Sequence, residues 1–451
     1  MSLQILRNIF QKNRSNDAIV WNDQIYSYGD MLQKLDDWGR FIDEHEIMSG
    51  TVVALQADFS PNAAALMLAL VERNAIIVPL TKSVITKKKE FLEIAQCEIE
   101  IAISESDNVT FNRFENTSAN HEHYEILRTR NHSGLVLFSS GSTGKSKAAV
   151  HDFELILEKF TVPRKALRTI SFLLYDHIGG INTMLHTFYN AGCLITVAER
   201  TPDAVARSIE KYQVELLPTS PTFLRLLLLS DVSQNYNLKS LNLITYGTEP
   251  MPESTLQQLH QTFSWIKIQQ TYGLSEIGIL RSKSKDSGSL WVKIGGEGFE
   301  TRVVDNILQI KSKSAMLGYL NAPAPFTDDG WFITGDMVEV DGEYMKILGR
   351  KSELINVGGQ KVYPAEVEAV IEELPEVVSA TVFGEDNMIT GKIVCARVQL
   401  RNDNSGSDKE TIKRIRLHCK QKLESFKIPM RIDFIETKNH NERFKKLRAI
   451  N

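Results

Sequence analysis

The stretch 137-LFSSGSTGKSKAAV-150 contains eight consecutive residues, Ser139 to Ser146, that are serine, threonine, glycine and a single lysine. The apolar run Leu135 to Phe138 comes directly before them. A short apolar run followed by Gly, Ser and Thr predicts a buried strand that ends in a loop. The backbone N–H groups and hydroxyls of such a loop are suited to phosphate oxygens. We therefore expect a phosphate-binding loop at the end of a strand.

This hydroxyl-rich loop differs from the two common nucleotide-binding patterns. Gly144-Lys145-Ser146 matches the end of the Walker A motif GxxxxGK[ST], but the first position of that motif is occupied by Ser139. Serine adopts the backbone conformation of that first glycine poorly, which disfavours a Walker A loop. The GxGxxG spacing of a dinucleotide-binding turn does not fit either. An ordinary polar turn and a flexible loop around the β- and γ-phosphates of a nucleotide remain as interpretations.

Length and composition indicate a multidomain globular protein. The chain of 451 residues exceeds what one hydrophobic core usually supports, and 42% hydrophobic with 24% charged residues is ordinary. The net charge of −4 gives no indication of nucleic-acid or membrane binding. The segment from Lys409 to Asn451 carries 13 Lys and Arg against 5 Asp and Glu. This basic end could hold a phosphorylated ligand or form a solvated charged surface.

Cysteine usage and apolar runs predict a cytoplasmic protein. The four cysteines are Cys97, Cys193, Cys395 and Cys419. They form no CxxC pair and have no histidine at metal-ligand spacing, which favours a reducing compartment over a structural zinc site. The segment before Ala18 has too short an apolar stretch for a signal peptide, and the apolar runs at 62–71 and 223–229 are too short to span a bilayer. We expect no membrane span and no nucleic-acid partner.

Alternating strand and helix patterns over the first half of the chain predict parallel sheets. Strand patterns occur at 51–57, 75–80, 193–198 and 242–247, and helical patterns at 30–47, 62–73 and 203–212. Such alternation is typical of βαβ units. Near Trp291 the pattern changes, and short alternating strands with glycine turns at 301–312 and 331–349 predict a small β-rich subdomain.

The pattern changes again after Gly349, where it predicts a separate α+β domain. Helical patterns occur at 364–375 and 408–425, and strand patterns at 377–385 and 391–400. The charged segment Arg350 to Glu353 is the expected linker. The predicted α/β architecture is therefore a large N-terminal domain (1–349) of parallel α/β subdomains plus the β-rich subdomain. A hinge (350–353) and a small mobile α+β C-terminal domain (354–451) follow it.

Three further stretches give the hydroxyl-rich loop a context: 270-QTYGLSEIG-278, 330-GWFITGD-336 and 348-LGRKSELINVGGQKVYPAEVE-368. Together with 139-SSGSTGKSK-147, in this order and spacing, they closely resemble the acyl-adenylate-forming superfamily. That superfamily includes acyl- and aryl-CoA synthetases, adenylation domains of peptide synthetases, and luciferases. The resemblance covers nearly the whole chain. It implies an enzyme that uses ATP and Mg²⁺ to convert a carboxylic acid to acyl-AMP and then transfers the acyl group to a thiol.

The implied chemistry explains why such residues are needed. A carboxylate does not react with a thiol, because its leaving group would be oxide or hydroxide. Attack of the carboxylate on the α-phosphate of ATP gives an acyl-AMP, whose leaving group is a phosphate ester. This first step brings an anion toward a polyanion, so positive charge and a metal ion must lie around the phosphates.

The resemblance assigns the triphosphate to the hydroxyl-rich loop. The residues that would hold it are Ser140, Gly141, Ser142, Thr143, Gly144 and Lys147, of which Lys147 would also be catalytic. Ser146 stands where the family usually has proline, and Ala148 where it usually has glycine. Both departures should alter the stiffness of the loop more than its chemistry.

Further residues are assigned to the metal, the nucleotide and the acid. Glu276, with Ser275 as the neighbouring hydroxyl, would be the catalytic glutamate that binds Mg²⁺, because a hard cation prefers an oxygen ligand. Asp336 would bind the ribose hydroxyls, with Arg350 supporting the ribose or the phosphates. Tyr272 would stack near adenine. The residues that would line adenine and the acyl pocket are Tyr246, Gly247, Thr248 and Glu249.

His177, in 175-YDHIGGIN-182, falls where the family places an aromatic residue or histidine beside the substrate carboxylate. A satisfied structural histidine is the alternative interpretation. Asp176 replaces the usual apolar or aromatic neighbour, which leaves the shape of the pocket open.

The C-terminal domain would supply the last catalytic group. Family members end in a GKxxR-like segment, and 444-FKKLR-448 is the best match, which makes Lys445 the catalytic lysine. Phe444 replaces the expected glycine and Lys446 follows directly, so a shift of one residue stays open. Ser352 would be the hinge residue. Rotation about it would bring the thiol-side residues Gly358, Gly359 and Lys361 to the active site.

Three functions are compatible with this pattern. The favoured one is a carboxylic acid–CoA ligase, aryl or fatty acyl. The second is a stand-alone adenylation enzyme that loads an acyl or aryl acid onto the phosphopantetheine of a carrier protein. The third is a non-catalytic nucleotide-binding protein, which the set Lys147, Glu276, Asp336 and Lys445 argues against. The identity of the acid does not follow from the sequence, because one fold accepts aromatic, fatty and small acids.

Overall fold

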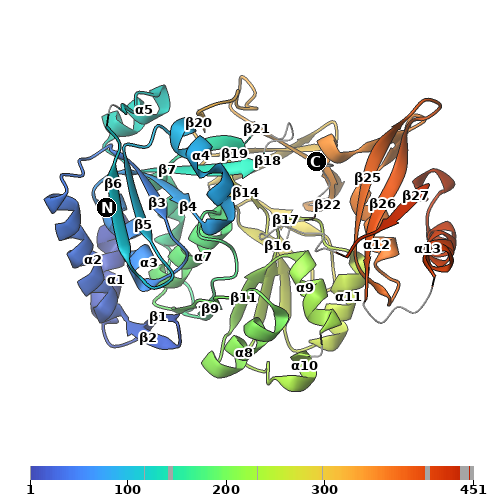
Figure 1. The fold of residues 1–451 in the computed structure, drawn as a ribbon, viewed down its shortest axis with the longest axis horizontal. Coiled ribbons are helices and arrows are strands. Elements are labelled where there is room, and N and C mark those ends of the chain that lie inside the picture. The colour runs from blue at the N-terminus through green and yellow to red at the C-terminus, as the bar shows by residue number, and fades with distance from the viewer. Residues whose placement is uncertain are drawn as a thin grey trace.

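The computed structural model describes residues 2–115, 117–140, 146–230, 232–296, 298–401, 407–436 and 446. Two seven-stranded sheets with helices, a six-stranded antiparallel sheet and a separate C-terminal sheet make up this part of the chain (Figure 1). Among the described helices, none combines the length and the apolar character that crossing a bilayer requires.

The first sheet carries the two strands that flank the hydroxyl-rich loop, in the order β20-β8-β7-β4-β3-β5-β6. Its strands are β3 (Val52–Gln56), β4 (Ile76–Leu80), β5 (Ile99–Ile103), β6 (Val109–Arg113), β7 (Gly134–Ser140), β8 (Ser146–Asp152) and β20 (Gly318–Tyr319). β5, β3, β4 and β7 pair in parallel, whereas β6, β8 and β20 join antiparallel. The predicted parallel α/β arrangement is confirmed.

The flanking strands extend further into the hydroxyl-rich stretch than the sequence predicts. β7 continues through Ser139 and Ser140, and β8 begins at Ser146, with Ser139 opposite Lys147. The prediction ended the strand at Phe138, because the residues that follow are polar. Antiparallel pairing satisfies backbone N–H and C=O groups whatever the side chain, so β7 and β8 continue to pair through these polar residues. Residues 141–145 lie outside the described part.

The second seven-stranded sheet has the order β13-β12-β11-β9-β10-β1-β2. Its strands are β1 (Asp17–Trp21), β2 (Gln24–Ser27), β9 (Arg168–Ile170), β10 (Cys193–Ile195), β11 (Leu216–Thr219), β12 (Leu243–Tyr246) and β13 (Lys267–Gln270). All neighbours pair in parallel except β1 and β2. The carboxyl ends of β11, β12 and β13 therefore meet at one edge, which is where open α/β sheets bind ligands.

Helices cover the faces of these sheets (Figure 1). They are α1 (Ser2–Lys12), α2 (Tyr28–Glu44), α3 (Pro61–Glu72), α4 (Lys88–Ile94), α5 (Glu122–Arg130), α6 (Phe153–Leu157), α7 (Ile178–Tyr189), α8 (Pro202–Tyr212), α9 (Pro221–Leu229), α10 (Val232–Asn235) and α11 (Glu253–Thr262), with short 3₁₀ turns η1 (Lys82–Lys87) and η2 (Glu158–Phe160). α3 is apolar on all sides, and every residue from Ala63 to Val71 is buried. A helix without a polar face has to be buried in this way. It lies at the centre of the largest core, which α1, α2 and α7 also enter.

The β-rich subdomain predicted after Trp291 is a six-stranded antiparallel sheet in the order β16-β17-β22-β21-β19-β18. Its strands are β16 (Ser282–Ser284), β17 (Val292–Ile294), β18 (Phe299–Val304), β19 (Ile307–Ser312), β21 (Phe332–Asp341) and β22 (Tyr344–Arg350). A small hairpin of β14 (Gly273–Leu274) and β15 (Gly278–Ile279) lies between it and β13 in sequence. The predicted β-rich subdomain is confirmed.

The C-terminal part forms an α+β unit with its own apolar core. Its elements are η3 (Lys351–Glu353), β23 (Ile355–Val357), β24 (Gln360–Val362), α12 (Pro364–Ile371), β25 (Val377–Asn387), β26 (Gly391–Leu400), α13 (Asp408–Lys422), η4 (Ser425–Lys427) and β27 (Arg431–Phe434). The core runs from Ile355 to Ile432 and draws on both helices. This orange and red unit lies at one end of the molecule, with β25 against α9 (Figure 1). The fold class is as predicted, and the boundaries 1–349, 350–353 and 354–451 stay predictions.

Candidate active site

Glu276 lies in the turn between β14 and β15, beside the strands that flank the hydroxyl-rich loop. Its Oε1 accepts hydrogen bonds from the Tyr319 hydroxyl at 2.8 Å and from the Ser139 hydroxyl at 3.5 Å. The Lys147 ammonium lies 5.2 Å from the centroid of the Tyr319 ring. Burial and the Glu276 carboxylate raise the pKa of Tyr319, so this hydroxyl keeps its proton and donates. The sheet thus brings a carboxylate and an ammonium to the base of the loop.

Two side chains fix the backbone around this cluster. The buried His151 ring places Nε2 2.5 Å from the carbonyl oxygen of Ser275, and burial lowers the pKa of this histidine. The Asn321 side chain accepts from the N–H of Ala148 at 3.1 Å and donates to the carbonyl of Ser146 at 2.8 Å. The start of β8 and the residue before Glu276 are both held in place as a result.

Asp336 forms a second polar group with the buried Tyr272 and the exposed Arg350. The Tyr272 hydroxyl donates to Oδ2 of Asp336 at 2.5 Å, and Nε of Arg350 lies 3.3 Å from Oδ1. Asp336 and Arg350 are directly opposite each other on the antiparallel strands β21 and β22. Burial, and after it the charge of Asp336, raise the pKa of Tyr272, so both contacts to the carboxylate come from donors.

Arg350 connects the two groups electrostatically. Burial opposes its charge, but the carboxylates of Asp336 and Glu276 outweigh burial and raise the pKa of the guanidinium. Glu276 and Asp336 therefore act on one cation, although one lies in the β14–β15 hairpin and the other on β21. The arrangement is one arginine that pairs with Asp336 and also feels the charge of Glu276, with a lysine on the Glu276 side.

The segment after β12 packs against the segment after β13. The Thr271 N–H donates to the Tyr246 carbonyl at 2.7 Å. A Cβ on Gly247 would come within 2.8 Å of Thr271 Oγ1, so close approach of the two segments requires glycine there. Thr248 has a φ of 76°, a strained backbone conformation of the kind that gathers at functional sites. Tyr246 is 1% exposed and belongs to the core behind this edge.

Glu249 faces the start of α9. Its Oε1 accepts from the Thr222 N–H at 2.9 Å and from the Thr222 hydroxyl. It also lines a cavity of about 470 Å³ whose wall includes Lys361 and Lys446 from the C-terminal part. Glu249 therefore lies where the second sheet meets the C-terminal unit.

His177 caps the N-terminus of α7. Its Nδ1 accepts the N–H of Gly179 at 3.0 Å, and the residue is half-buried. A Cβ on Gly180 would lie 2.0 Å from the Leu174 carbonyl oxygen, so glycine lets the helix start against the preceding turn. The neighbouring Asp176 is buried, and its Oδ2 accepts from the Thr81 hydroxyl at 3.0 Å.

Gly358 and Gly359 form the two-residue turn between β23 and β24. Their φ values of 58° and 88° are positive, as the turns that suit a two-residue hairpin require. The Gly359 N–H donates to Asn356 Oδ1 at 2.9 Å. The turn and Lys361 are exposed, and so is Ser352 within η3. The glycine turn and Lys361 lie on the C-terminal unit, whereas Ser352 follows Arg350 by only two positions, in η3, which contacts β21.

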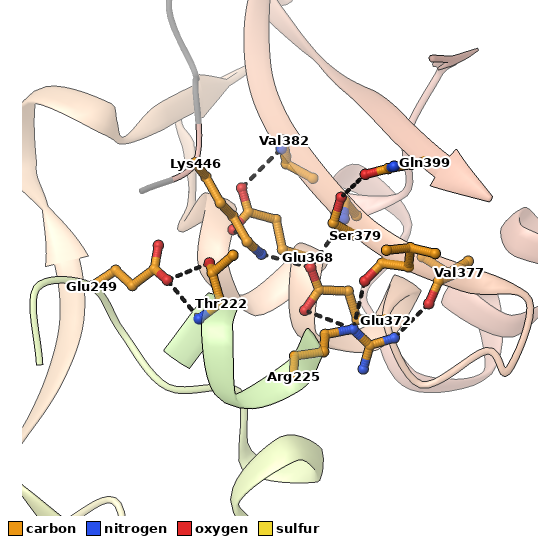
Figure 2. A network of polar contacts seen from close by, with 12 residues as sticks. Thr222, Arg225, Glu249, Glu368, Glu372, Val377, Ser379, Val382, Gln399 and Lys446 are labelled. Atoms are coloured by element: carbon orange, nitrogen blue, oxygen red, sulfur yellow. Dashed lines mark hydrogen bonds and ion pairs between the residues drawn. The ribbon is translucent and has the colours of Figure 1, made fainter. Parts of the chain in front are cut away.

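The Lys446 side chain lies between the carboxylates of Glu368 on α12 and Glu372 directly after that helix (Figure 2). Its Nζ lies 3.2 Å from Glu368 Oε2 and 2.7 Å from Glu372 Oε1. Burial opposes the ammonium, but these two carboxylates and Glu249 raise its pKa. Beside them, Arg225 of α9 donates to the carbonyls of Val377 at 2.6 Å and Val378 at 2.8 Å. This network joins the C-terminal unit to the second sheet.

The structure therefore brings together Lys147, Glu276, Tyr272, Asp336 and Arg350 among the predicted residues. The predicted Gly141, Ser142, Thr143, Gly144 and Lys445 lie outside the described residues, and Ser140 ends β7. Sequence reasoning missed Tyr319 and Asn321, because their role depends on contacts with β8 and Glu276, which are distant in sequence. Ser139, in the hydroxyl-rich stretch, also donates to Glu276, although it was not predicted as a site residue.

Comparison with known families decides the relationship. The family model described as AMP-binding enzyme matches residues 6–306. The chain belongs to the AMP-binding enzyme family. The model of the AMP-binding enzyme C-terminal domain matches residues 366–445, which contain α12, β25, β26 and α13.

Two curated relatives and one solved structure place this AMP-binding enzyme among known proteins. It is 30% identical over 344 residues to acyl-CoA synthetase 7 of Caenorhabditis elegans, covering 69% of this chain and 63% of the relative. It is 28% identical over 295 residues to an indoleacetate–CoA ligase of Aromatoleum aromaticum, covering 58% and 56%. The chain thus spans less than two thirds of the length of these relatives. The crystal structure of an anthranilate CoA ligase with anthranoyl-AMP superposes with a TM-score of 0.83 at 19% identity, covering 99% and 95%, which shows the shared fold.

Proposed function

We propose that this AMP-binding enzyme is an AMP-forming acid–thiol ligase that activates a carboxylic acid with ATP and passes the acyl group to CoA. The observation that carries the proposal is the cluster of Arg350 beside the buried Asp336, with the Glu276 carboxylate acting on the same guanidinium and Lys147 near the Glu276 side. Such an arrangement supplies both charge for phosphates and carboxylate oxygens for a metal ion and a ribose. Relatives that are acyl-CoA synthetases and CoA ligases support the same reaction class.

In the first step, an oxygen of the acid attacks the α-phosphorus of ATP, and the bond to pyrophosphate breaks. Lys147, with the loop residues Ser140 to Gly144, holds the phosphates and balances their charge. Mg²⁺, when bound, supplies further positive charge at the phosphate oxygens. Glu276 fits this ion, because Mg²⁺ is usually held by one or two carboxylates together with substrate phosphates. The donors Tyr319 and Ser139 orient that carboxylate.

Asp336 and Arg350 serve the nucleotide. A carboxylate offers two acceptor oxygens, which suit the two neighbouring hydroxyls of a ribose. Tyr272 and Arg350 hold Asp336 in one orientation before any ligand binds. Tyr272 and the segment Tyr246 to Glu249, with Ser275, form the surroundings of adenine, and the strained Thr248 lies in the middle of that segment.

The acid lies along the start of α7. His177 caps this helix, and its ring is half-buried at the helix end. We place the reacting carboxylate there, with Tyr246 and Gly247 behind the acyl group. Because Tyr246 belongs to the core, its contribution is to the wall of the pocket rather than to a contact with charge.

In the second step, the thiolate attacks the acyl carbonyl carbon, and AMP leaves with the electron pair of the C–O bond. Gly358, Gly359 and Lys361 are on the side of the C-terminal domain that we assign to the thiol. Lys445 on the same domain is the adenylating lysine. The ammonium of Lys446 is engaged by Glu368 and Glu372, which supports Lys445 over its neighbour.

Because the two steps use different faces of the C-terminal domain (354–451), we assign the segment 350–353 as the pivot. Ser352 to proline tests it. Proline is tolerated in the first turn of a helix, so the chain should fold as before, but φ is then fixed near −65°. We expect pyrophosphate release from acid and ATP to persist while thioester formation falls at least about 10-fold, measured as separate half-reactions. Equal slowing of both steps in a folded variant contradicts a pivot at Ser352.

The proposed reaction as a whole is tested by a pyrophosphate-release screen over aromatic and aliphatic acids, followed by thioester detection. We expect release that depends on acid and Mg²⁺, and a thioester with CoA. Carrier proteins bearing phosphopantetheine form a parallel arm. If a thioester forms on a carrier protein but not on CoA, the acceptor is the carrier protein rather than CoA. The proposed adenylation step is unaffected by that result. ATP binding without release for any acid contradicts the ligase proposal.

A further inference from the structure

Lys159 lies in η2, in contact with two elements that carry residues of the proposed active site. Its Nζ donates to the side-chain oxygen of Asn182 at 2.6 Å and to the carbonyl of Ile279 at 3.0 Å. Asn182 is on α7, the helix that His177 caps, and Ile279 is on β15, three positions after Glu276. The ring of Phe160 lies 4.9 Å from the same ammonium.

Among the described residues, the Lys159 ammonium has hydrogen-bond acceptors but no carboxylate at ion-pair distance. Within the part of the chain that the structure describes, no carboxylate forms an ion pair with it. Burial lowers the pKa of Lys159 to about 7. The pKa of His186, one turn after Asn182 on α7, is lowered to about 4 by burial and by the charges of Arg164 and Lys159. The surroundings are therefore basic as well as poorly solvated.

Such an ammonium is costly for a protein to keep. A lysine has three N–H donors, and two of them are used here by neutral oxygens. A charge removed from water without an opposite charge destabilises the fold, and protein structures normally pair it. An apolar side chain would avoid this cost. The arrangement fits a group that is completed by a ligand with a negative charge.

The position of Lys159 suits the far end of an acyl group. Asn182 comes five positions after His177, which corresponds to about 7.5 Å along a helix axis. Lys159, Asn182 and Ile279 are all half-buried residues, so this group lies at the border of the core rather than at its centre. A Cβ on Gly278, next to Ile279, would meet no atom within 4 Å, so the neighbouring residue on β15 has open space beside it.

We propose that Lys159, held by Asn182, binds a carboxylate at the distal end of the acyl group, so that this enzyme prefers acids with a second carboxylate. The inference rests on the proposed function, because it concerns the acid that is adenylated. The reacting carboxylate lies at the His177 end of α7 and the second carboxylate at Lys159. One free N–H of the ammonium and its charge both serve the second carboxylate.

The test compares dicarboxylic acids with their monomethyl esters, which keep the length but lose the distal charge. Pyrophosphate release is measured over a series of chain lengths and for an aromatic dicarboxylic acid. We expect kcat/KM of the unmodified protein to favour the best diacid over its ester by at least about 10-fold, as a charge-assisted hydrogen bond provides. Lys159→Met should bring this ratio close to one, whereas Lys159→Arg should keep most of it.

Two further variants make the test specific. Asn182→Asp keeps the shape of the side chain but gives Lys159 an internal carboxylate, so the preference for the diacid should also disappear. Lys165→Met removes an exposed lysine that pairs with Glu215, and the ratio should stay unchanged. Thermal unfolding followed by circular dichroism shows whether each variant is folded.

Two kinetic results overturn the inference. One is an unmodified protein that favours the ester or does not distinguish the pair. The other is a folded Lys159→Met variant that loses activity toward both compounds by the same factor. Absence of pyrophosphate release with every acid contradicts the proposed function instead. In that case, diacid binding to the unmodified protein and to Lys159→Met is measured by calorimetry. Weaker binding to the variant supports the carboxylate site at Lys159, and equal binding overturns it.

Discussion

Replacing Lys445 with alanine is expected to lower acid-dependent pyrophosphate release by about 100- to 1,000-fold, while thioester formation from supplied acyl-AMP stays near its normal rate. The reason is that the lysine cation is needed only while negative charge builds up at the α-phosphate, and removal of one such donor typically has this effect. The two half-reactions are measured separately, one by pyrophosphate release and the other by thioester formation. A similar loss in both would show a general role in folding or binding.

Lys446→Met is the matched control, and the structure gives it a different expected result. The ammonium of Lys446 lies between Glu368 and Glu372, so its loss takes a cation away from two buried carboxylates. Breaking a buried pair in this way typically costs about 3–5 kcal/mol. We expect a lower unfolding temperature of the C-terminal unit, with adenylation retained below that temperature. The opposite pattern, a normal Lys445→Ala enzyme and a folded Lys446→Met variant without pyrophosphate release, assigns the catalytic role to Lys446.

The network around Lys446 also explains why the C-terminal unit has a defined position. Arg225 of α9 donates to the carbonyls of Val377 and Val378 at the start of β25, and Glu372 lies 3.9 Å from the same guanidinium (Figure 2). Charged groups at such an interface fix orientation more than they add affinity. In the proposed two-step reaction the C-terminal unit turns between the steps, and contacts that are specific in one arrangement and can be exchanged for others suit such a turn.

The local spacing of apolar residues was sufficient to predict the fold class. The alternating patterns at 51–57, 62–73 and 75–80 correspond to β3, α3 and β4, because an apolar strand or helix of that length has to be buried wherever it lies. The same holds for the short antiparallel strands after Trp291. The end of β7 was predicted less well, because hydrogen bonding of its backbone to β8 is independent of the polar side chains at Ser139 and Ser140.

The site was predictable only where a motif is continuous in sequence. Glu276 and Asp336 are part of such motifs, and the structure brings both to Arg350. Tyr319, which orients Glu276, is on a two-residue strand whose role depends on pairing with β8. Like Tyr319, Lys159 could not be predicted as a site residue, because its local sequence does not distinguish it from a surface lysine. Its environment is created by α7 and β15, which meet it only in the folded chain.

Glu276→Gln is expected to reduce pyrophosphate release at low Mg²⁺ by about 100-fold or more, the other large effect in this enzyme. Glutamine keeps the size of the side chain and an oxygen that can accept from the Tyr319 hydroxyl, but it lacks the negative charge that a hard cation prefers. Raising the Mg²⁺ concentration should therefore restore part of the rate.

Tyr319→Phe is the matched control: it keeps the ring beside Lys147 and removes one hydrogen bond to the carboxylate, so a loss of about 10-fold is expected. A Glu276→Gln enzyme with an unchanged rate at low Mg²⁺ would show that the metal is held elsewhere. A reduced rate that does not respond to Mg²⁺, in contrast, would assign Glu276 to the shape of the loop rather than to the metal.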